Sequence, residues 1–129
     1  MDKAAVRTEA APAPFQGAPY SQAIRASGFV FVSGQLGLKP GHSEMAGDAI
    51  EAQTAQVLDN LEAILREAGS GVDRIVKTTV FLTSLEDFQG MNSVYAERMG
   101  EVPPARSTVE VAALPSGALV EIEAIALAS

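Results

Sequence analysis

Apolar residues recur at helical spacing between Asp48 and Ala68, and this pattern predicts the longest helix of the chain. Its apolar side comprises Ile50, Thr54, Val57, Leu58, Leu61, Ile64, Leu65 and Ala68, and its polar side comprises Glu51, Gln53, Asp59, Glu62, Arg66 and Glu67. Asp48 is expected to cap the first turn, and Gly69 is expected to end the helix. Because only one side is apolar, we expect this helix to cover a sheet.

Short β-prone runs on both sides of this helix predict the strands. Residues 23–26 and 29–32 flank Ser27-Gly28 and predict a hairpin. Residues 74–82 predict a strand with Val76, Thr78, Val80 and Leu82 on one face and Lys77, Thr79 and Phe81 on the other. Two further strands are expected at 107–111 and 119–127, separated by a turn at 115–117.

A second helix is expected at 85–99, where Phe88, Met91, Tyr95 and Met99 share one side. Pro103-Pro104 ends this unit. The order of elements indicates the α+β class, with both helices on one face of a sheet. Residues 1–129 are expected to form a single domain, in which residues 1–18 are partly irregular.

Composition excludes several kinds of chemistry. The 129 residues include no cysteine and only one histidine, His42, so disulfides, thiolate metal sites, a cysteine nucleophile and histidine pairs are excluded. We expect His42 to be an exposed loop residue, and no metal or cofactor is expected. The net charge of −7 argues against nucleic-acid binding. Without a signal-peptide core or a long apolar stretch, we expect a cytoplasmic protein that does not bind a membrane.

Arg106 is the first candidate for a binding residue. It follows the rigid Pro103-Pro104 pair at the start of an expected strand. Its planar guanidinium suits bidentate capture of a carboxylate. In a chain with a surplus of acidic residues, the alternative is an ion pair between Arg106 and an internal glutamate.

Glu121 and Glu123 lie on one face of the last expected strand, together with Leu119, Ile125 and Leu127. Among these aliphatic neighbours, a partly desolvated carboxyl would have a raised pKa suited to proton transfer. The alternative is an exposed strand face that carries two solvated charges.

Six sequence blocks together resemble the RidA family, also called the YjgF family, of reactive intermediate imine deaminases. The blocks are Pro19-Tyr20-Ser21-Gln22-Ala23, Phe31-Val32-Ser33-Gly34-Gln35, Ile50-Glu51-Ala52-Gln53-Thr54, Lys77-Thr78-Thr79-Val80-Phe81-Leu82, Pro104-Ala105-Arg106-Ser107-Thr108-Val109-Glu110-Val111 and Val120-Glu121-Ile122-Glu123-Ala124. They occur in the order of the family and span nearly the whole chain from Tyr20 onward.

The resemblance implies a chorismate-mutase-like fold assembled as a homotrimeric barrel, with three active sites in clefts between subunits. It implies hydrolysis of 2-imino acids such as 2-iminobutanoate and 2-iminopropanoate, or of their enamines, to 2-keto acids and ammonia without a cofactor. Arg106 would then clamp the substrate carboxylate and Glu121 would position the attacking water. The cleft would be lined by Tyr20, Ser33, Gly34, Asn92, Ser107 and Thr108. An iminium carbon is already electrophilic, so no nucleophilic side chain is required.

Three positions depart from the pattern of the family. Ala18 stands where glycine is frequent, which is expected to shift the approach to Tyr20. Thr108 stands where some members have cysteine, and Gly37 stands where many have proline, which is expected to loosen the loop after Gly34.

Two alternatives to the deaminase remain open. The first is a non-catalytic, holdase-like trimer of the same family, whose clefts bind a small carboxylate. The second is a ribonuclease or translation inhibitor, against which the net charge of −7 and the absence of a basic patch weigh.

Overall fold

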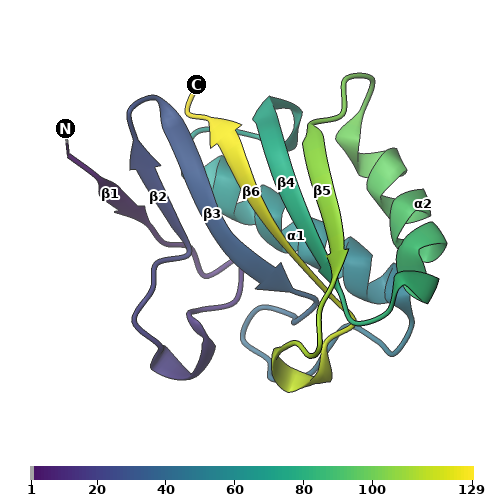
Figure 1. Cartoon of the computed structure of the whole chain (residues 1–129). Coiled ribbons are helices and arrows are strands. Elements are labelled where there is room, and N and C mark those ends of the chain that lie inside the picture. Colours follow the sequence, from purple (N-terminus) through teal and green to yellow (C-terminus); the bar gives the residue numbers. More distant parts are fainter. Residues whose placement is uncertain (1) are drawn as a thin grey trace.

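The computed structural model describes residues 2–129, within which the strands form one six-stranded sheet in the order β1-β2-β3-β6-β4-β5 (Figure 1). The strands are β1 (Ala4–Val6), β2 (Ala23–Ala26), β3 (Phe29–Leu36), β4 (Ile75–Leu82), β5 (Ala105–Glu110) and β6 (Val120–Leu127). Neighbouring strands are antiparallel except for β4 and β5, which are parallel and joined through a helix. The strand that comes last in the sequence therefore lies inside the sheet.

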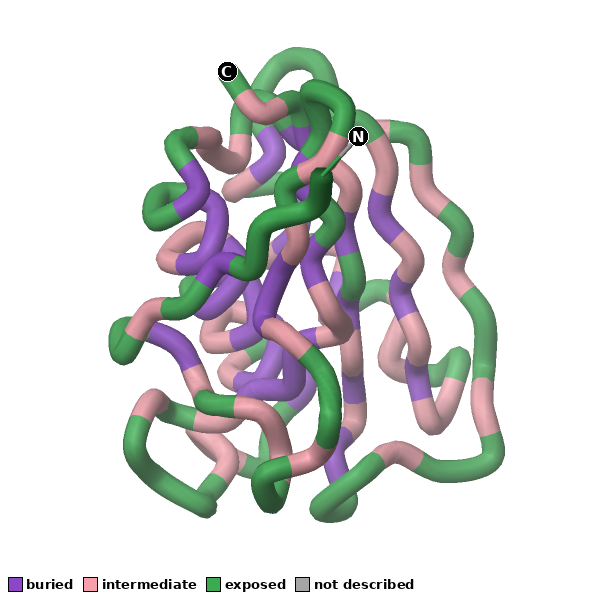
Figure 2. Tube along the Cα trace, turned by 90° about the vertical axis from the view of Figure 1, so that its left-hand side faces the viewer, coloured by how far each residue is buried: buried purple, intermediate pink, exposed green. Residues whose placement is uncertain are grey.

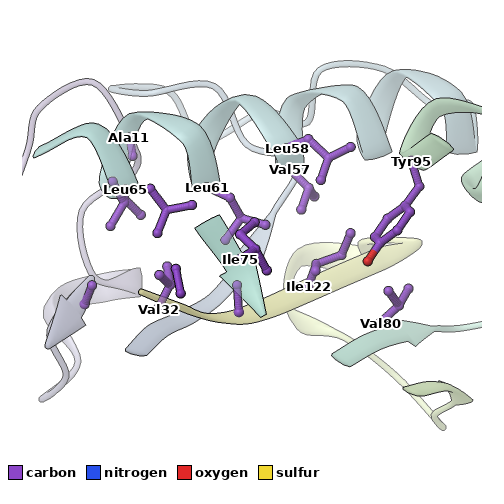
Figure 3. Packing of buried hydrophobic residues seen from close by; sticks show 14 of the residues in the cluster. Ala11, Val32, Val57, Leu58, Leu61, Leu65, Ile75, Val80, Tyr95 and Ile122 are labelled. Carbon is purple, nitrogen blue, oxygen red and sulfur yellow. The ribbon is translucent and has the colours of Figure 1, made fainter. Parts of the chain in front are cut away.

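Both predicted helices are present, as α1 (Ile50–Glu67) and α2 (Phe88–Met99), and both pack on the same face of the sheet (Figures 1 and 3). Gly69 ends α1 as predicted, with a positive φ of 81° and a hydrogen bond from the Ser70 amide to the Leu65 carbonyl. The predicted cap at Asp48 is wrong, because Ala49 holds the N-cap position without a side-chain bond. Residues 85–87 form a separate 3₁₀ turn before α2.

The core lies between α1, α2 and the sheet (Figures 2 and 3). All eight residues predicted for the apolar side of α1 are buried. On β6 every second side chain is buried, from Val120 to Ala126, which confirms the predicted alternation. Burial of large aliphatic side chains such as Leu61 and Ile122 supplies about 1.5–3 kcal/mol each.

Two predicted side-chain orientations are wrong. Gln53 was expected on the polar side of α1, but it is buried, donates to the Gly47 carbonyl and accepts from the Leu119 amide. Val76 was expected on the same face of β4 as Thr78, Val80 and Leu82, but it is exposed whereas those three are buried. A bulge between Ile75 and Lys77 breaks the alternation and gives the inward position to Ile75.

The strand of residues 105–110 begins two residues earlier than the predicted 107–111, and β3 continues four residues beyond the predicted 29–32. The loosening expected after Gly34 stays a prediction. Gly37 is buried, and a Cβ at this position would lie 2.9 Å from the Gln53 backbone of α1. The small residue therefore permits close packing between the end of β3 and α1.

Gln22 orders much of the N-terminal segment. Among residues 2–18, the regular elements are β1 and the 3₁₀ turn Phe15–Gly17. The buried Gln22 amide accepts from the Thr8 amide and donates to the carbonyls of Thr8, Ala11 and Pro12. Ala18 has a φ of −61°, which any L-residue adopts. The departure at Ala18 therefore forces no shift of Tyr20.

We expect Gln22→Ala to lower the free energy of unfolding by about 2–3 kcal/mol, because it leaves buried backbone groups of residues 8–12 without partners. Urea unfolding at fixed protein concentration measures this loss. Gln89→Ala on the exposed side of α2 is the control, with an expected change within about 0.5 kcal/mol. Equal effects of the two substitutions would contradict the assignment of Gln22.

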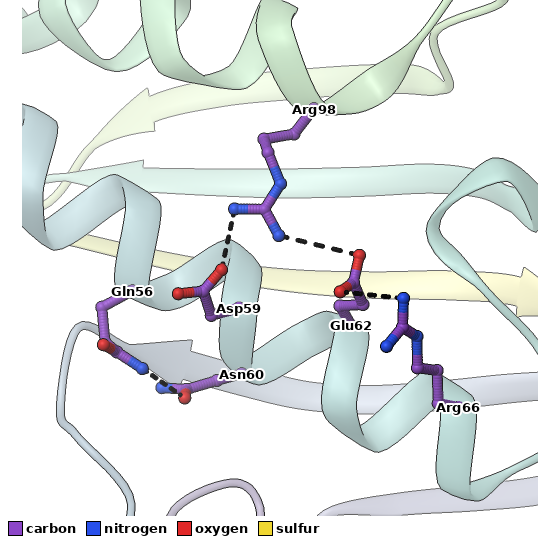
Figure 4. A network of polar contacts seen from close by, with 6 residues as sticks. All are labelled: Gln56, Asp59, Asn60, Glu62, Arg66 and Arg98. Atoms are coloured by element: carbon purple, nitrogen blue, oxygen red, sulfur yellow. Dashed lines mark hydrogen bonds and ion pairs between the residues drawn. The ribbon is translucent and has the colours of Figure 1, made fainter.

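A polar network joins the exposed sides of the two helices (Figure 4). Arg98 of α2 pairs with Asp59 and Glu62 of α1, and Glu62 also pairs with Arg66. Within α1, Gln56 donates to Asn60, whose own amide donates to the carbonyls of Leu36 and Leu38. Exposed pairs of this kind contribute little stability, whereas buried Asn60 fixes the path of the chain after β3.

The sheet face opposite the helices is accessible to solvent and carries apolar side chains as well as Lys77, Thr79, Ser107 and Glu123. We call it the open face and define it by Phe29, Phe31, Phe81, Val109, Ile125 and Leu127. Phe29 is opposite Leu127 and Phe31 is opposite Ile125 in the strand register. Exposed apolar surface of this kind typically marks an interaction site.

Candidate functional site

Arg106 lies on the helix-covered side of β5. Its register partner in β4 is Thr78, which is fully buried under the helices. The Cζ atom of its guanidinium lies 4.8 Å from the ring centroid of Tyr95 and 5.6 Å from that of Phe88. Arg106 is thus held by two aromatic rings of α2 at the edge of the sheet.

No internal carboxylate neutralises Arg106. The ion pairs found in residues 2–129 involve Arg66 and Arg98 and leave Arg106 out. The alternative of an ion pair between Arg106 and an internal glutamate is therefore wrong. The N–H groups of the guanidinium remain available to an external anion.

Asn92 and Arg106 line the same pocket. This pocket has a volume of about 390 Å³ and is also lined by Tyr95, Ala96, Met99, Gly100, Pro103 and Pro104. The Oδ1 atom of Asn92 is buried and has no hydrogen-bond partner among residues 2–129. The free guanidinium in the wall of this pocket suits a ligand that carries an acid group.

Glu121 and Gly34 form a second group, on the opposite side of the sheet from Arg106. Glu121 pairs in register with Phe81 of the open face, and a Cβ on Gly34 would overlap its carboxylate. Burial, followed by the charge of Glu123, raises the pKa of the Glu121 carboxyl. A carboxyl of this kind is suited to accept and return a proton.

Tyr20 and Ser33 stand near this second group. Tyr20 and Gly34 line a pocket of about 640 Å³, whose wall also includes His42. The Tyr20 hydroxyl accepts from the Phe15 amide, and the Ser33 hydroxyl donates to the Ser21 carbonyl. Ser33 therefore retains only acceptor capacity, while His42 is exposed as predicted and lies at the pocket wall.

Ser107 and Thr108 lie on opposite faces of β5. The Ser107 hydroxyl accepts from Lys77 on the open face. Thr108 pairs with buried Val80 and shares the helix-covered side with Arg106, but it does not line the pocket of Arg106 and Asn92. Of these two residues, only Thr108 is on the same side as the guanidinium.

A single chain therefore presents two half-sites rather than one constellation. We call Arg106 and Asn92 the arginine half-site, and Tyr20, Gly34 and Glu121 the glutamate half-site. The first lies at the β5 edge under α2, and the second lies where β3 meets β6 on the open face. The sequence did not reveal this separation, nor that Phe88 and Tyr95 flank Arg106, although their spacing placed both on one side of α2.

The raised pKa of Glu121 predicts a pH-dependent stability. The folded chain binds this proton more tightly than the unfolded chain, where the ordinary pKa is 4.5. The stability that protonated Glu121 contributes is therefore present below pH 4.5 and is lost as the pH rises through the raised value. We expect Glu121→Gln to increase the free energy of unfolding more at pH 7 than at pH 4, as measured by urea unfolding.

Glu123→Gln removes only the smaller cause of the raised pKa and should give a smaller gain at pH 7. A gain from Glu121→Gln that is equal at the two pH values would contradict this prediction.

Residues 2–129 contain no cluster of three or more histidine, cysteine, aspartate or glutamate side chains arranged to hold a metal ion. In the same range, neither helix combines the length and the hydropathy needed to cross a bilayer.

Comparison with known proteins gives consistent matches along the chain. The sequence profile of the family described as Endoribonuclease L-PSP matches residues 8–128. A RutC family protein of Pyrococcus abyssi is 48% identical over 98% of this chain and 98% of its own length. The protein of Arabidopsis thaliana named Reactive Intermediate Deaminase A, chloroplastic, is 48% identical over 98% of this chain and 66% of its own length.

The solved structure of RidA from the Antarctic bacterium Psychrobacter sp. has the same fold. It superposes with a TM-score of 0.91 at 41% sequence identity and covers 96% of this chain and 98% of that one.

Proposed function

Because the chain belongs to the Endoribonuclease L-PSP family, which includes RutC and Rid proteins, we propose that it is a hydrolytic deaminase. Its substrates would be 2-imino acids or their enamine tautomers, and its products 2-keto acids and ammonia. The observation that carries this assignment is the unpaired Arg106 guanidinium in the wall of a pocket that Asn92 also lines. A 2-imino acid supplies the carboxylate that this guanidinium lacks.

In the proposed reaction, Arg106 binds the carboxylate and fixes the position of the imine carbon. Glu121 accepts a proton from a water molecule as that water adds to the protonated C=N bond and forms a carbinolamine. The same proton then passes to nitrogen and ammonia leaves as the hydroxyl proton moves to Glu121, which gives this proton to the departing ammonia and so becomes a carboxylate again. The Glu121 carboxyl, whose pKa is raised, accepts and releases the protons of the reaction. Because water itself adds to the imine carbon, no covalent enzyme intermediate is required.

The two half-sites act together only if different copies of the chain supply them. We propose the homotrimer, in which the β5 edge of one subunit faces the glutamate half-site of its neighbour. The exposed apolar side chains of the open face support such an assembly, because contact between copies would remove these side chains from water. The arginine half-site faces the helix-covered side and the glutamate half-site faces the open side, which argues against a site within one chain.

The test is a coupled assay. A threonine or serine dehydratase releases the imine, and semicarbazide competes for it. We expect the protein to accelerate 2-keto acid formation and to reduce the amount of trapped semicarbazone. No acceleration with either imine would favour the carboxylate-binding trimer without catalysis. RNA cleavage by pure protein would favour the ribonuclease, which the net charge of −7 does not support.

Gly34→Ala is expected to lower kcat by about 10²-fold, because a methyl group would displace the Glu121 carboxylate from the attacking water. Steady-state rates in the coupled assay measure this loss. The double variant Gly34→Ala with Glu121→Asp is the matched control, because the shorter acid makes room for the methyl group and should recover part of the rate. Turnover of Gly34→Ala within about threefold of wild type would remove Glu121 from the mechanism.

A further inference from the structure

The environment of Arg106 includes a buried hydroxyl pair that the proposed reaction does not use. The Tyr95 hydroxyl lies 2.6 Å from Thr78 Oγ1. Tyr95 is 5% exposed and Thr78 is 0% exposed. Thr78 is also the register partner of Arg106 across β4 and β5. The residue next to Arg106 in the sheet therefore fixes the ring over which Arg106 lies.

This arrangement reduces the entropy that an arginine side chain loses when it binds a carboxylate. An arginine side chain has many rotamers, and ordering it on binding costs affinity. Stacking on an aromatic ring occupies the face of the guanidinium and leaves its in-plane N–H groups free. With Tyr95 and Phe88 both within 6 Å of the Cζ atom, the guanidinium is oriented before a ligand arrives.

We infer that Tyr95, anchored by Thr78, and Phe88 are positioning residues that hold the Arg106 guanidinium ready for a ligand carboxylate. The two rings contact the Arg106 guanidinium and affect ligand binding by orienting it. This inference rests on the proposed role of Arg106 in binding the carboxylate of the substrate. It assigns a binding function to the buried hydroxyl pair of Tyr95 and Thr78, which would otherwise serve only packing.

Binding of pyruvate, a small 2-keto acid, provides the test because it needs no turnover. We expect Tyr95→Leu and Phe88→Leu each to raise the Kd for pyruvate about tenfold. Tyr95→Phe keeps the ring but loses the bond to Thr78, and its Kd should rise about threefold or less. In the coupled assay, the same losses should appear mainly in KM, because a positioning residue for the carboxylate does not touch the reacting carbon.

Met91→Leu is the matched control, since Met91 is a fully buried residue of α2 that does not line the pocket of Arg106. It should alter stability without altering the Kd. Coupling through Arg106 is tested in a cycle: in the Arg106→Lys background, which keeps the charge but has no planar guanidinium, Tyr95→Leu should raise the Kd by clearly less than the roughly tenfold expected in the wild type. If Tyr95→Leu does not fold, half-buried Phe88 supplies the equivalent variant.

The Nε–H resonance of Arg106 separates this inference from the proposed function. Ring currents should shift the resonance in the wild type, and the shift should decrease in Tyr95→Leu and in Phe88→Leu. A resonance and a Kd that both stay unchanged in these variants would overturn the inference, even in an active deaminase. A wild type without turnover would refute the proposed function, yet loss of the shift and weaker pyruvate binding in the variants would still support the inference.

Discussion

Arg106→Ala is expected to lower kcat/KM for a 2-imino acid by about 10³-fold, because removal of a charged hydrogen-bonding partner costs several kcal/mol of transition-state binding. No neighbouring cation in its pocket can replace it, since the other lining residues are uncharged. The coupled dehydratase assay measures the loss. Pyruvate binding should be lost in parallel, because both ligands carry the same carboxylate.

Two further variants make this result specific. Arg106→Lys keeps the charge but loses the planar fork, so we expect it to recover only a minor part of the rate. Arg98→Ala removes an arginine that is already paired with Asp59 and Glu62, and it should leave turnover within about twofold of wild type. An Arg106→Ala protein that kept a tenth of its turnover would exclude the guanidinium as the carboxylate clamp.

Phe31→Glu should convert the assembly to single chains and abolish turnover, because it places an additional charge among the exposed apolar residues of the open face. Light scattering measures the assembly. The wild type should have three times the chain mass of 13.4 kDa, and the variant should have the mass of one chain. Val102→Glu is the control, because Val102 is 86% exposed and lies outside the open face. A trimeric Phe31→Glu protein would show that the open face is not the interface.

Mixed assemblies test whether the two half-sites come from different chains. Arg106→Ala and Glu121→Gln subunits, each inactive alone, should recover about a quarter of wild-type turnover after equal mixing and reassembly, because that fraction of random interfaces has both residues intact. Recovery of no activity would place both residues in one chain.

The parts of the fold that depend on local periodicity were predictable from the sequence. The apolar spacing along α1 identifies its buried side, and alternation along β6 identifies the face of Glu121. Local deviations were not predictable. The bulge that turns Val76 outward leaves no mark in the pattern, and buried Gln53 has one of its partners, the Leu119 amide, 66 residues away.

The candidate site was predictable as a set of residues and not as an arrangement. The sequence blocks contain Arg106, Gly34 and Glu121, and the family resemblance implies Asn92. Strand order and side-chain direction separate these residues into two half-sites. The contact of Arg106 with the two aromatic rings could not be predicted from the sequence either, because α2 and β5 are separate elements that meet only in the folded chain. Helical spacing assigns Tyr95 to the core without revealing that it contacts a cation.

The position of β6 also constrains how the protein is made. This strand pairs with β3 on one side and β4 on the other, yet it leaves the ribosome after both. Until then, the nascent chain holds two incomplete sheets, β1-β2-β3 and β4-β5, whose inner edges have unpaired backbone groups. Completion of the sheet is therefore delayed until β6 is available, and nascent chains on neighbouring ribosomes present matching edges to one another during that interval.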